Sequence, residues 1–315
     1  MAAIVILGVF VADTAYRADR SPRIGETIMG TSFALGPGGK GSNQAVAAAR
    51  VGGDVSFLSK LGKDPFADMA LATWKAAGVK PRVQQLADSY TGAAYIFIEN
   101  STGNNAIIIC PGVAATICEA DIEAERALIE GAKVFVTQLE QPMPAALRAL
   151  QIARAAGVTT ILNPAPAAPL TDAMLALCDY VTPNETEVEA LTGIPVHSVE
   201  DAALAAEALL ARGVGAAIIT LGERGAYFHS RDLQRLVPVI NAGPVVETTG
   251  AGDAFNGGFA AALARGDAPI DAVIYGTAVA GISVTRPGTA PSMPSAAEVA
   301  ALMAKDQPHP ATAGK

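Results

Sequence analysis

Short, continuously apolar runs alternate along the chain with segments whose apolar residues recur at helical spacing. The run Ala3–Phe10 is of the first kind and is typical of a strand that is covered on both faces. Strands are also predicted over residues 55–59, 133–138, 158–162, 180–182 and 216–221. Helices are predicted over residues 42–51, 65–77, 116–130, 144–156, 170–177, 185–191 and 199–212. This alternation predicts right-handed βαβ units and an α/β fold, with a mainly parallel sheet between two layers of helices.

Capping signals mark several helix ends. The pair Gly52-Gly53 follows the first predicted helix as a C-cap, and Gly78 closes the second. The tetrapeptide Thr-Ile-Cys-Glu at 116–119 has the pattern of a capping box, so we expect a helix to open at Thr116 and run to about Glu130.

Two segments, residues 14–38 and 90–110, break this rhythm. The second is expected to form two strands around a turn at Asn100–Asn105. Both are too short for separate domains, so they predict a small β-sheet lid beside the carboxyl ends of the parallel strands. The α/β domain would then comprise residues 1–13, 39–89 and 111–305. We expect the tail, residues 306–315, to be mobile.

Composition excludes several functional classes. The chain has 315 residues and a formal charge of −8, which argues against a nucleic-acid partner. It is 51% hydrophobic, but no run of about 18 apolar residues is free of charged or turn residues, so neither a spanning helix nor a membrane partner is predicted. The N-terminal apolar run lacks a basic region and a cleavage pattern, and therefore reads as a strand and not as a signal peptide.

The cysteines and histidines do not form a recognisable site. Three cysteines without metal-ligand spacing fit a reducing cytoplasm, and the three histidines are far apart in sequence, which disfavours a metal site or a Ser-His-Asp triad. These residues are Cys110, Cys118, Cys178, His197, His229 and His309.

The strongest chemical signal is TTGAGDAFNGGFAAAL at residues 248–263. Gly250, Ala251 and Gly252 precede apolar residues at helical spacing and are predicted to form the first turn of a helix. Backbone N–H groups converge there and the helix dipole is positive, so the turn can bind an anion. Asp253, in the same turn, could cap the helix or face a substrate hydroxyl.

A second glycine cluster, GPGGKGSNQA at residues 36–45, lets the backbone approach a ligand closely. Lys40 and Asn43 supply hydrogen-bond donors. The spacing is not that of a Walker A loop, and the cluster does not follow the first strand as a dinucleotide fingerprint would. Two glycine loops, a carboxylate at an anion site and the lack of a metal-ligand cluster together indicate phosphoryl transfer, in which positioning and charge stabilisation dominate.

Several motifs, in order along the chain, resemble those of the ribokinase-like (PfkB-type) carbohydrate kinases. They are GPGGKGSNQAVAAAR at 36–50, QLEQP at 138–142, LNPAPA at 162–167, TPNETEVEALTG at 182–193, TLGERG at 220–225, TTGAGDAFNGG at 248–258 and VTRPGTAPS at 284–292. The resemblance runs from Ile4 to about Ser292. It implies a three-layer α/β/α domain with a β-sheet lid that covers the sugar and often forms a dimer contact.

The resemblance also implies roles for individual residues in the ATP-dependent phosphorylation of D-ribose at its 5-hydroxyl. Asp253 resembles the family's catalytic base, and Gly250, Ala251 and Gly252 resemble its anion hole. Sugar contacts are implied for Asp13, Gly39, Lys40, Gly41, Asn43, Glu140 and Asp253. Carboxylates and amides suit a polyol, because each hydroxyl both donates and accepts a hydrogen bond.

The remaining implied roles concern the nucleotide and its cations. Asn184 and Glu187 match the motif that orders Mg²⁺, water and the phosphates. Nucleotide contacts are implied for Thr220, Leu221, Gly222, Glu223, Arg224, Gly225, Gly252 and Thr277. A monovalent-cation site, usually for K⁺, is implied for Glu247, Thr249, Ser283, Arg286, Gly288 and Ser292.

Two positions depart from the family pattern. Val11 stands where an asparagine commonly reaches the sugar, and a site that lacks a polar contact loses discrimination. Glu247 stands where aspartate is common, so the dependence on K⁺ could differ. A fructokinase or nucleoside kinase on the same scaffold therefore stays open, as do a non-catalytic sugar-binding regulator and, more remotely, an NAD-binding dehydrogenase.

Overall fold

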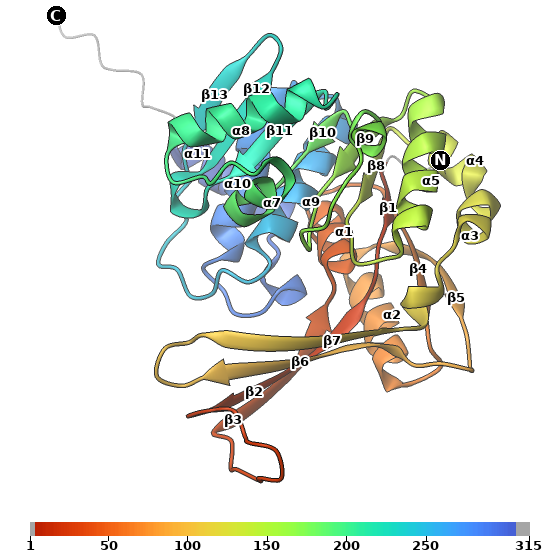
Figure 1. Ribbon diagram of the computed structural model, residues 1–315, viewed down its shortest axis with the longest axis vertical. Helices are drawn as coiled ribbons and strands as arrows, with labels where there is room; N and C mark the ends of the chain where they lie inside the picture. Colours follow the sequence, from red (N-terminus) through yellow and green to blue (C-terminus); the bar gives the residue numbers. More distant parts are fainter. Residues whose placement is uncertain (1–3, 307–315) are drawn as a thin grey trace, which may run out of the picture.

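Most strands form one sheet with the order β13-β12-β11-β10-β9-β8-β1-β4-β5 in the computed structural model, which describes residues 4–306 (Figure 1). Neighbours from β5 to β11 are parallel, and β12 and β13 are added antiparallel. The strands are β1 (Ile4–Leu7), β4 (Val55–Leu61), β5 (Lys80–Gln85), β8 (Val134–Thr137), β9 (Thr159–Leu162), β10 (Tyr180–Val181), β11 (Ala216–Thr220), β12 (Ala226–Ser230) and β13 (Gln234–Val237). The predicted mainly parallel α/β fold is confirmed.

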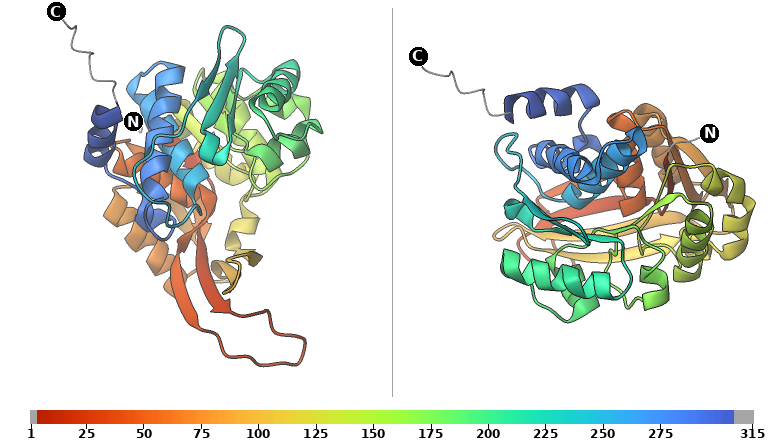
Figure 2. Two further views of the ribbon diagram at one scale, coloured as in Figure 1. Left: turned by 90° about the vertical axis from the view of Figure 1, so that its left-hand side faces the viewer. Right: turned by 90° about the horizontal axis from the view of Figure 1, so that it is seen from above.

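Helices cover both faces of this sheet, and the view from above shows the three layers (Figure 2). One core lies under α1 (Lys40–Arg50), α2 (Pro65–Ala77), α9 (Ala251–Arg265), α10 (Pro269–Ser283) and α11 (Ala296–Asp306). The other lies under α3 (Glu119–Ala124), α4 (Arg126–Glu130), α5 (Met143–Ala155), α6 (Asp172–Leu175), α7 (Glu185–Thr192) and α8 (Val199–Ala211). Because both faces of β1 are covered, all four of its residues are buried.

A smaller sheet projects from the carboxyl end of the large one, with the strand order β3-β2-β6-β7 (Figures 1 and 2). Its strands are β2 (Val11–Ala18), β3 (Ser32–Gly38), β6 (Thr91–Glu99) and β7 (Asn105–Gly112). The two strands predicted around the turn at residues 100–105 are β6 and β7. We call this small sheet the lid.

The predicted helix 116–130 is wrong in its start and its continuity. Thr116 ends a 3₁₀ turn, η1 (Val113–Thr116), because its hydroxyl donates back to the Val113 carbonyl at 2.7 Å. The N-cap is Cys118, whose backbone N–H donates to Asp121 at 2.8 Å. The capping box therefore pairs Cys118 with Asp121 and not Thr116 with Glu119, two residues later than predicted.

Strands β5, β12 and β13 were not predicted. β5 lies at the edge of the sheet, has the polar sequence KPRVQQ and pairs with β4 through its backbone. Its sequence therefore contains no apolar run from which a strand could be predicted. The predicted tail begins at Asp306, which ends α11, and its other residues, 307–315, lie outside the described residues. Within residues 4–306, none of the helices is long and apolar enough to cross a bilayer.

Candidate active site

Helix α9 begins at the predicted glycine turn. Its N-cap, Gly250, has a φ of 82°, a left-handed conformation that favours glycine, and Ala251 and Gly252 form the first turn. A Cβ atom added to Gly252 would meet nothing within 4 Å, so the space in front of this turn is open. The small residues therefore leave the N-terminus of α9 accessible to an anion.

The Asp253 carboxylate points from this turn to helix α1, which begins within the second glycine cluster. Asn43 Nδ2 donates to its Oδ2 at 3.0 Å, and Gln44 Nε2 donates to its Oδ1 at 3.1 Å. The residue is only 7% exposed, and burial raises the pKa of its carboxyl, while Lys40 and the two amides oppose that rise. Asp253 does not cap α9, because its side-chain bonds go to α1.

Lys40 lies among carboxylates that come from separate segments. Its backbone N–H donates to Glu140 Oε2 at 2.8 Å, and burial raises the pKa of Glu140 to about 7, against the opposing charge of Lys40. Burial also raises the pKa of Asp13 to about 6, and the charges of Asp253 and Glu247 add to this rise. The predicted sugar residues therefore share one electrostatic environment, with an excess of carboxyl groups over cations.

Among the described residues, Asn43 has a free acceptor, whereas the neighbouring glycines are packed against the backbone that follows β1. Asn43 Oδ1 is buried and has no hydrogen-bond partner among residues 4–306, so it is an acceptor in need of a donor. Gly39 has a φ of 87°, and a Cβ there would lie 2.5 Å from the Val9 carbonyl oxygen. A Cβ on Gly41 would lie 2.7 Å from Gly8 Cα, so close packing of α1 on β1 already requires glycine at position 41.

The predicted nucleotide residues lie at the carboxyl ends of β10 and β11. Asn184 and Thr220 form an isolated parallel bridge. Asn184 Oδ1 accepts the Glu187 N–H at 2.8 Å, and Glu187 accepts the Asn184 N–H at 2.9 Å, so a capping box holds both side chains at the start of α7. Burial raises the pKa of Glu187.

The other predicted nucleotide contacts lie in and around a 3₁₀ turn after β11, except Thr277, which lies in α10. Gly222, Glu223 and Arg224 form the 3₁₀ turn η2 (Gly222–Arg224) between Leu221 and Gly225. Arg224 already donates to the His197 carbonyl at 2.7 Å and to Glu185 at 3.2 Å. Thr277 is buried in α10, where its hydroxyl donates to the Val273 carbonyl at 2.9 Å.

Part of the predicted monovalent-cation set is joined by hydrogen bonds. Glu247 Oε2 accepts the Gly288 N–H at 2.8 Å, and the Glu247 N–H donates to the Val284 carbonyl at 3.2 Å. Ser283 ends α10, and Ser292 lies in the 3₁₀ turn η3 (Ala290–Ser292). Arg286 is ion-paired with Glu298, and Thr249 is exposed.

A buried group of polar side chains beneath Asp253 was missed by sequence reasoning. All its members belong to motifs quoted for the family resemblance, but the sequence does not show that they meet. They are Gln44, Gln138, Asn163, Thr182 and Asn256.

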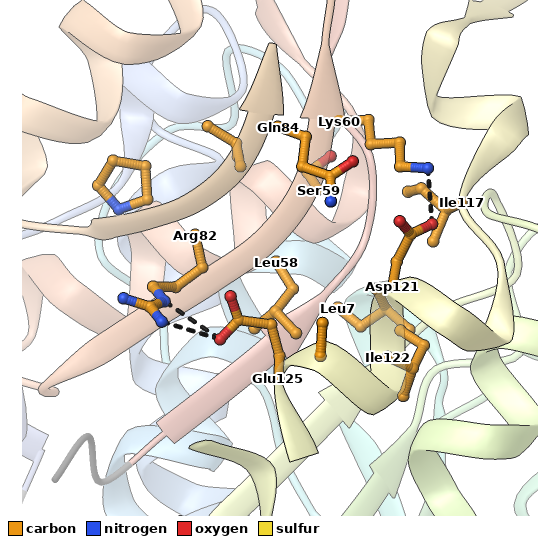
Figure 3. Close-up of a pocket in the computed structure, with 13 residues that line it drawn as sticks. Leu7, Leu58, Ser59, Lys60, Arg82, Gln84, Ile117, Asp121, Ile122 and Glu125 are labelled. Atoms are coloured by element: carbon orange, nitrogen blue, oxygen red, sulfur yellow. Dashed lines mark hydrogen bonds and ion pairs between the residues drawn. The ribbon is translucent and has the colours of Figure 1, made fainter. Parts of the chain in front are cut away.

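A separate hollow of about 240 Å³ lies between β4, β5 and α3 (Figure 3). Lys60 there is paired with Asp121 at 2.6 Å, and Arg82 is paired with Glu125 at 3.0 Å. None of the predicted site residues lines it.

Residues 1–296 match the model of a family described as "pfkB family carbohydrate kinase". The chain belongs to this family. It is 35% identical over 296 residues to a ribokinase of Haemophilus influenzae, covering 94% of this chain and 96% of that protein. It is also 35% identical over 294 residues to a deoxyribokinase of Salmonella typhi, with coverages of 93% and 95%. Membership of the pfkB family makes the protein a phosphotransferase with an alcohol group as acceptor.

The fold agrees with that assignment. The solved structure of Arabidopsis thaliana ribokinase, complexed with ribose and ATP, superposes with a TM-score of 0.90 at 29% identity, covering 96% of this chain and 98% of that one. The pfkB-family fold, a three-layer α/β/α domain with a β-sheet lid, is therefore the fold of this protein.

Proposed function

We propose that the protein transfers the γ-phosphate of ATP to the 5-hydroxyl of D-ribose, with Asp253 as the general base. The observation that carries this proposal is the Asp253 carboxylate, held in the open first turn of α9 and hydrogen-bonded to Asn43 behind the glycine loop. The similarity to proteins named ribokinase, and to one solved with ribose and ATP, supports the choice of substrates.

In the proposed step, Asp253 accepts the proton of the 5-hydroxyl while that oxygen forms a bond to the γ-phosphorus. The bond from the γ-phosphorus to the bridging oxygen breaks, and ADP leaves with its electrons. N–H groups of the Gly250–Ala251–Gly252 turn stabilise the charge on the moving phosphoryl group. A carboxylate suffices as base because little proton transfer is needed before the transition state.

The polar residues around Lys40 suit a neutral polyol. Asn43 Oδ1 would accept a hydrogen bond from one hydroxyl, and Asp13 and Glu140 would accept from others. A phosphorylated sugar would place its charge beside several carboxyl groups and one ammonium, which is unfavourable. A free sugar is therefore the better substrate for this site.

A nucleoside is a poor fit, because the lid aromatics lie on the wrong face. Asp13 and Tyr16 are three residues apart on β2 and so project from opposite faces. Phe33 pairs with Tyr16, and Tyr95 pairs with Thr14, which places both aromatic rings on the Tyr16 face. No aromatic platform for a base therefore accompanies Asp13 on these strands.

A second candidate substrate is 2-deoxy-D-ribose. Val11 is 3% exposed and lies two residues before Asp13 on β2, so the two side chains share a face of that strand. An apolar side chain there offers no hydrogen bond to a hydroxyl, and the similarity to a deoxyribokinase adds weight.

We propose that Mg²⁺ arrives with ATP. No cluster of three or more His, Cys, Asp or Glu side chains among residues 4–306 could hold a metal by itself. This fits Mg²⁺, which retains waters and is commonly bound through phosphates and one or two carboxylates. Asn184 and Glu187 would orient that group, and Mg²⁺ would neutralise phosphate charge. Residues 220–225 and Thr277 would border the nucleotide.

The monovalent-cation site is a further part of the proposal. Glu247, Thr249, Ser283, Arg286, Gly288 and Ser292 would surround K⁺ close to the α9 turn. The bond between Glu247 and Gly288 supports this, since it joins the segment before α9 to the segment after α10.

We also propose a homodimer formed through the lid. Its face opposite to Asp13 exposes Tyr16 (42%), Phe33 (57%) and Ile108 (63%), and an apolar surface of this kind is typical of protein contacts. Phe33→Asp should yield monomers in light scattering, whereas Arg23→Asp, a change on the exposed chain between β2 and β3, should leave the dimer intact. A monomeric parent protein would contradict this part.

An ATP-dependent sugar kinase acts where ATP is made, so we place it in the cytoplasm.

A coupled assay of ADP release tests the substrate. Ribose, 2-deoxyribose, fructose and adenosine would be compared with MgATP, in the presence and absence of K⁺. We expect D-ribose to give the highest kcat/KM. Turnover of fructose or adenosine without turnover of ribose would overturn the proposal, and faster turnover of 2-deoxyribose would select the second candidate.

A further inference from the structure

Gln44 holds the second oxygen of the Asp253 carboxylate. It is completely buried, and its Nε2 donates to Asp253 Oδ1 at 3.1 Å, whereas the other oxygen, Oδ2, bonds to Asn43. Asn43 is 3% exposed, and its buried Oδ1 has no hydrogen-bond partner among residues 4–306, so we assign it to sugar contact in the proposed function. Gln44 is fully buried, so it can affect the reaction only through the residues that it holds, and Asp253 is the one of these that is the proposed base.

The direction of the Gln44 amide is fixed by its neighbours. Gln138 Nε2 donates to Gln44 Oε1 at 2.6 Å, and Gln44 Nε2 also donates to Asn163 Oδ1 at 3.1 Å. A half-turn of the Gln44 amide would place its oxygen against the oxygens of Asp253 and Asn163, and its NH₂ against that of Gln138. Only the observed orientation pairs a donor with an acceptor in each of these three contacts, and Gln138 Oε1 is left without a partner among residues 4–306.

The same network reaches the anion-hole turn from below. Asn163 Nδ2 donates to the Thr182 carbonyl at 2.9 Å, and the Thr182 hydroxyl donates to Asn256 Oδ1 at 2.7 Å. Asn256 Nδ2 in turn donates to the Gly252 carbonyl at 2.8 Å. One connected set of buried hydrogen bonds thus supports both the carboxylate and the turn that precedes it.

We propose that Gln44 is a positioning residue that orients the Asp253 carboxylate and keeps it ionised, and that Gln138 sets the direction of the Gln44 amide. This inference rests on the proposed role of Asp253 as the base. The role is separate from substrate contact, because both glutamines are fully buried.

The surroundings of Asp253 make such support necessary. Burial favours its protonated form and Lys40 favours its ionised form, and the charge of ionised Asp253 in turn raises the pKa values of Asp13, Glu140 and Glu187. The amides of Asn43 and Gln44 donate to the ionised form and so oppose protonation. Removing the Gln44 donor would raise the pH at which Asp253 becomes a competent base.

The test compares Gln44→Met and Gln138→Met with a matched control, Gln141→Met. Methionine has nearly the size of glutamine but no amide. Gln141 is also buried, but its Nε2 donates to Thr137 Oγ1 at 2.8 Å and to the Gln138 carbonyl, outside the path to Asp253. The measurements are kcat and sugar KM against pH with saturating MgATP, using the sugar that the unmodified enzyme turns over best.

For Gln44→Met we expect kcat at neutral pH to fall by about tenfold or more, and the acid limb of the kcat profile to move up by about one pH unit. Sugar KM should change by less than about threefold, because Gln44 does not reach the sugar. Gln138→Met should move the limb in the same direction by less, and Gln141→Met should leave it in place. An unmoved limb in Gln44→Met, or an equal shift in the control, would overturn the inference.

A second readout needs no substrate. The free energy of unfolding is measured against pH for the same variants by urea titration. A higher folded-state pKa of Asp253 extends the loss of stability with rising pH to higher pH in Gln44→Met, but not in Gln141→Met. Identical pH dependences would contradict the inference. Failure of the unmodified enzyme to phosphorylate any sugar would instead contradict the proposed function and leave this readout to decide the role of Gln44.

Discussion

Gly257 controls how closely the two helices of the candidate site approach each other. It lies on α9, where an added Cβ would be 2.5 Å from Ala47 Cβ, 2.7 Å from the Gln44 carbonyl oxygen and 2.8 Å from the Ala48 nitrogen. Carbon atoms normally pack at about 3.5–4.0 Å. Gly257→Ala therefore requires α1 and α9 to separate by about 1 Å.

That displacement would break the hydrogen bonds that hold Asp253. The donor–acceptor distances to Asn43 and Gln44 are 3.0 and 3.1 Å, so about 1 Å more places both beyond hydrogen-bond range. A misplacement of this size near reacting groups can cost about 10²-fold in rate, which is the loss of kcat that we expect. Overpacking costs about 1–3 kcal/mol, but alanine returns about 1 kcal/mol of helix propensity, so the free energy of unfolding should fall by at most about 2 kcal/mol.

Gly258→Ala is the matched control. Its Cβ would lie 2.7 Å from Val279 Cγ2, at the interface of α9 with α10 and away from α1. We expect a comparable loss of stability in urea titrations but a kcat within about threefold of the parent. The reasoning would be refuted by a Gly257→Ala variant with parental kcat, or by equal losses of kcat in both variants.

The remaining predictions concern Asp253, Glu140 and the monovalent cation. Asp253→Asn should lower kcat by about 10²–10⁴-fold while ribose still binds in calorimetry, and turnover above about a tenth of the parent's would exclude Asp253 as the base. The folded-state pKa of Glu140 is about 7, against an ordinary value of 4.5, so the folded protein retains a proton that the unfolded chain releases. The stabilisation that Glu140 contributes is full below about pH 4.5 and is lost as pH rises to about 7. Glu140→Gln should therefore flatten the dependence of the unfolding free energy on pH. An unchanged slope would contradict the raised pKa of Glu140. Replacing K⁺ by Li⁺ should lower kcat in the parent and have little further effect in Glu247→Ala, and equal effects of the exchange in both proteins would exclude Glu247 from the cation site.

Local signals predicted the elements whose ends are fixed locally. Helix α2 has the predicted limits, Pro65–Ala77, because Asp64 caps its start and Gly78 adopts a left-handed conformation at its end. The lid hairpin and the glycine turn before Asp253 were also predicted, since each depends on neighbouring residues. Thr116 shows the limit of such signals, because its hydroxyl donates to the preceding Val113 carbonyl and the helix opens two residues later, at Cys118.

The support beneath Asp253 could not be predicted in the same way. Gln44, Gln138 and Asn163 come from three separate motifs, and their contacts depend on how β8, β9 and α1 stack. Each residue alone fits a loop or a helix interior equally well. Asp253, the proposed base, has a local signature, whereas the residues that hydrogen-bond to it are brought together by the tertiary fold.

The most direct measurement is ³¹P NMR of the purified protein with MgATP, K⁺ and D-ribose, beside the Asp253→Asn variant. The parent should convert the γ-phosphate signal into ribose 5-phosphate with equimolar ADP, and the variant should leave ATP intact on the same timescale. Equal amounts of sugar phosphate from both proteins, or ADP with inorganic phosphate and no sugar phosphate from the parent, would contradict the central claim.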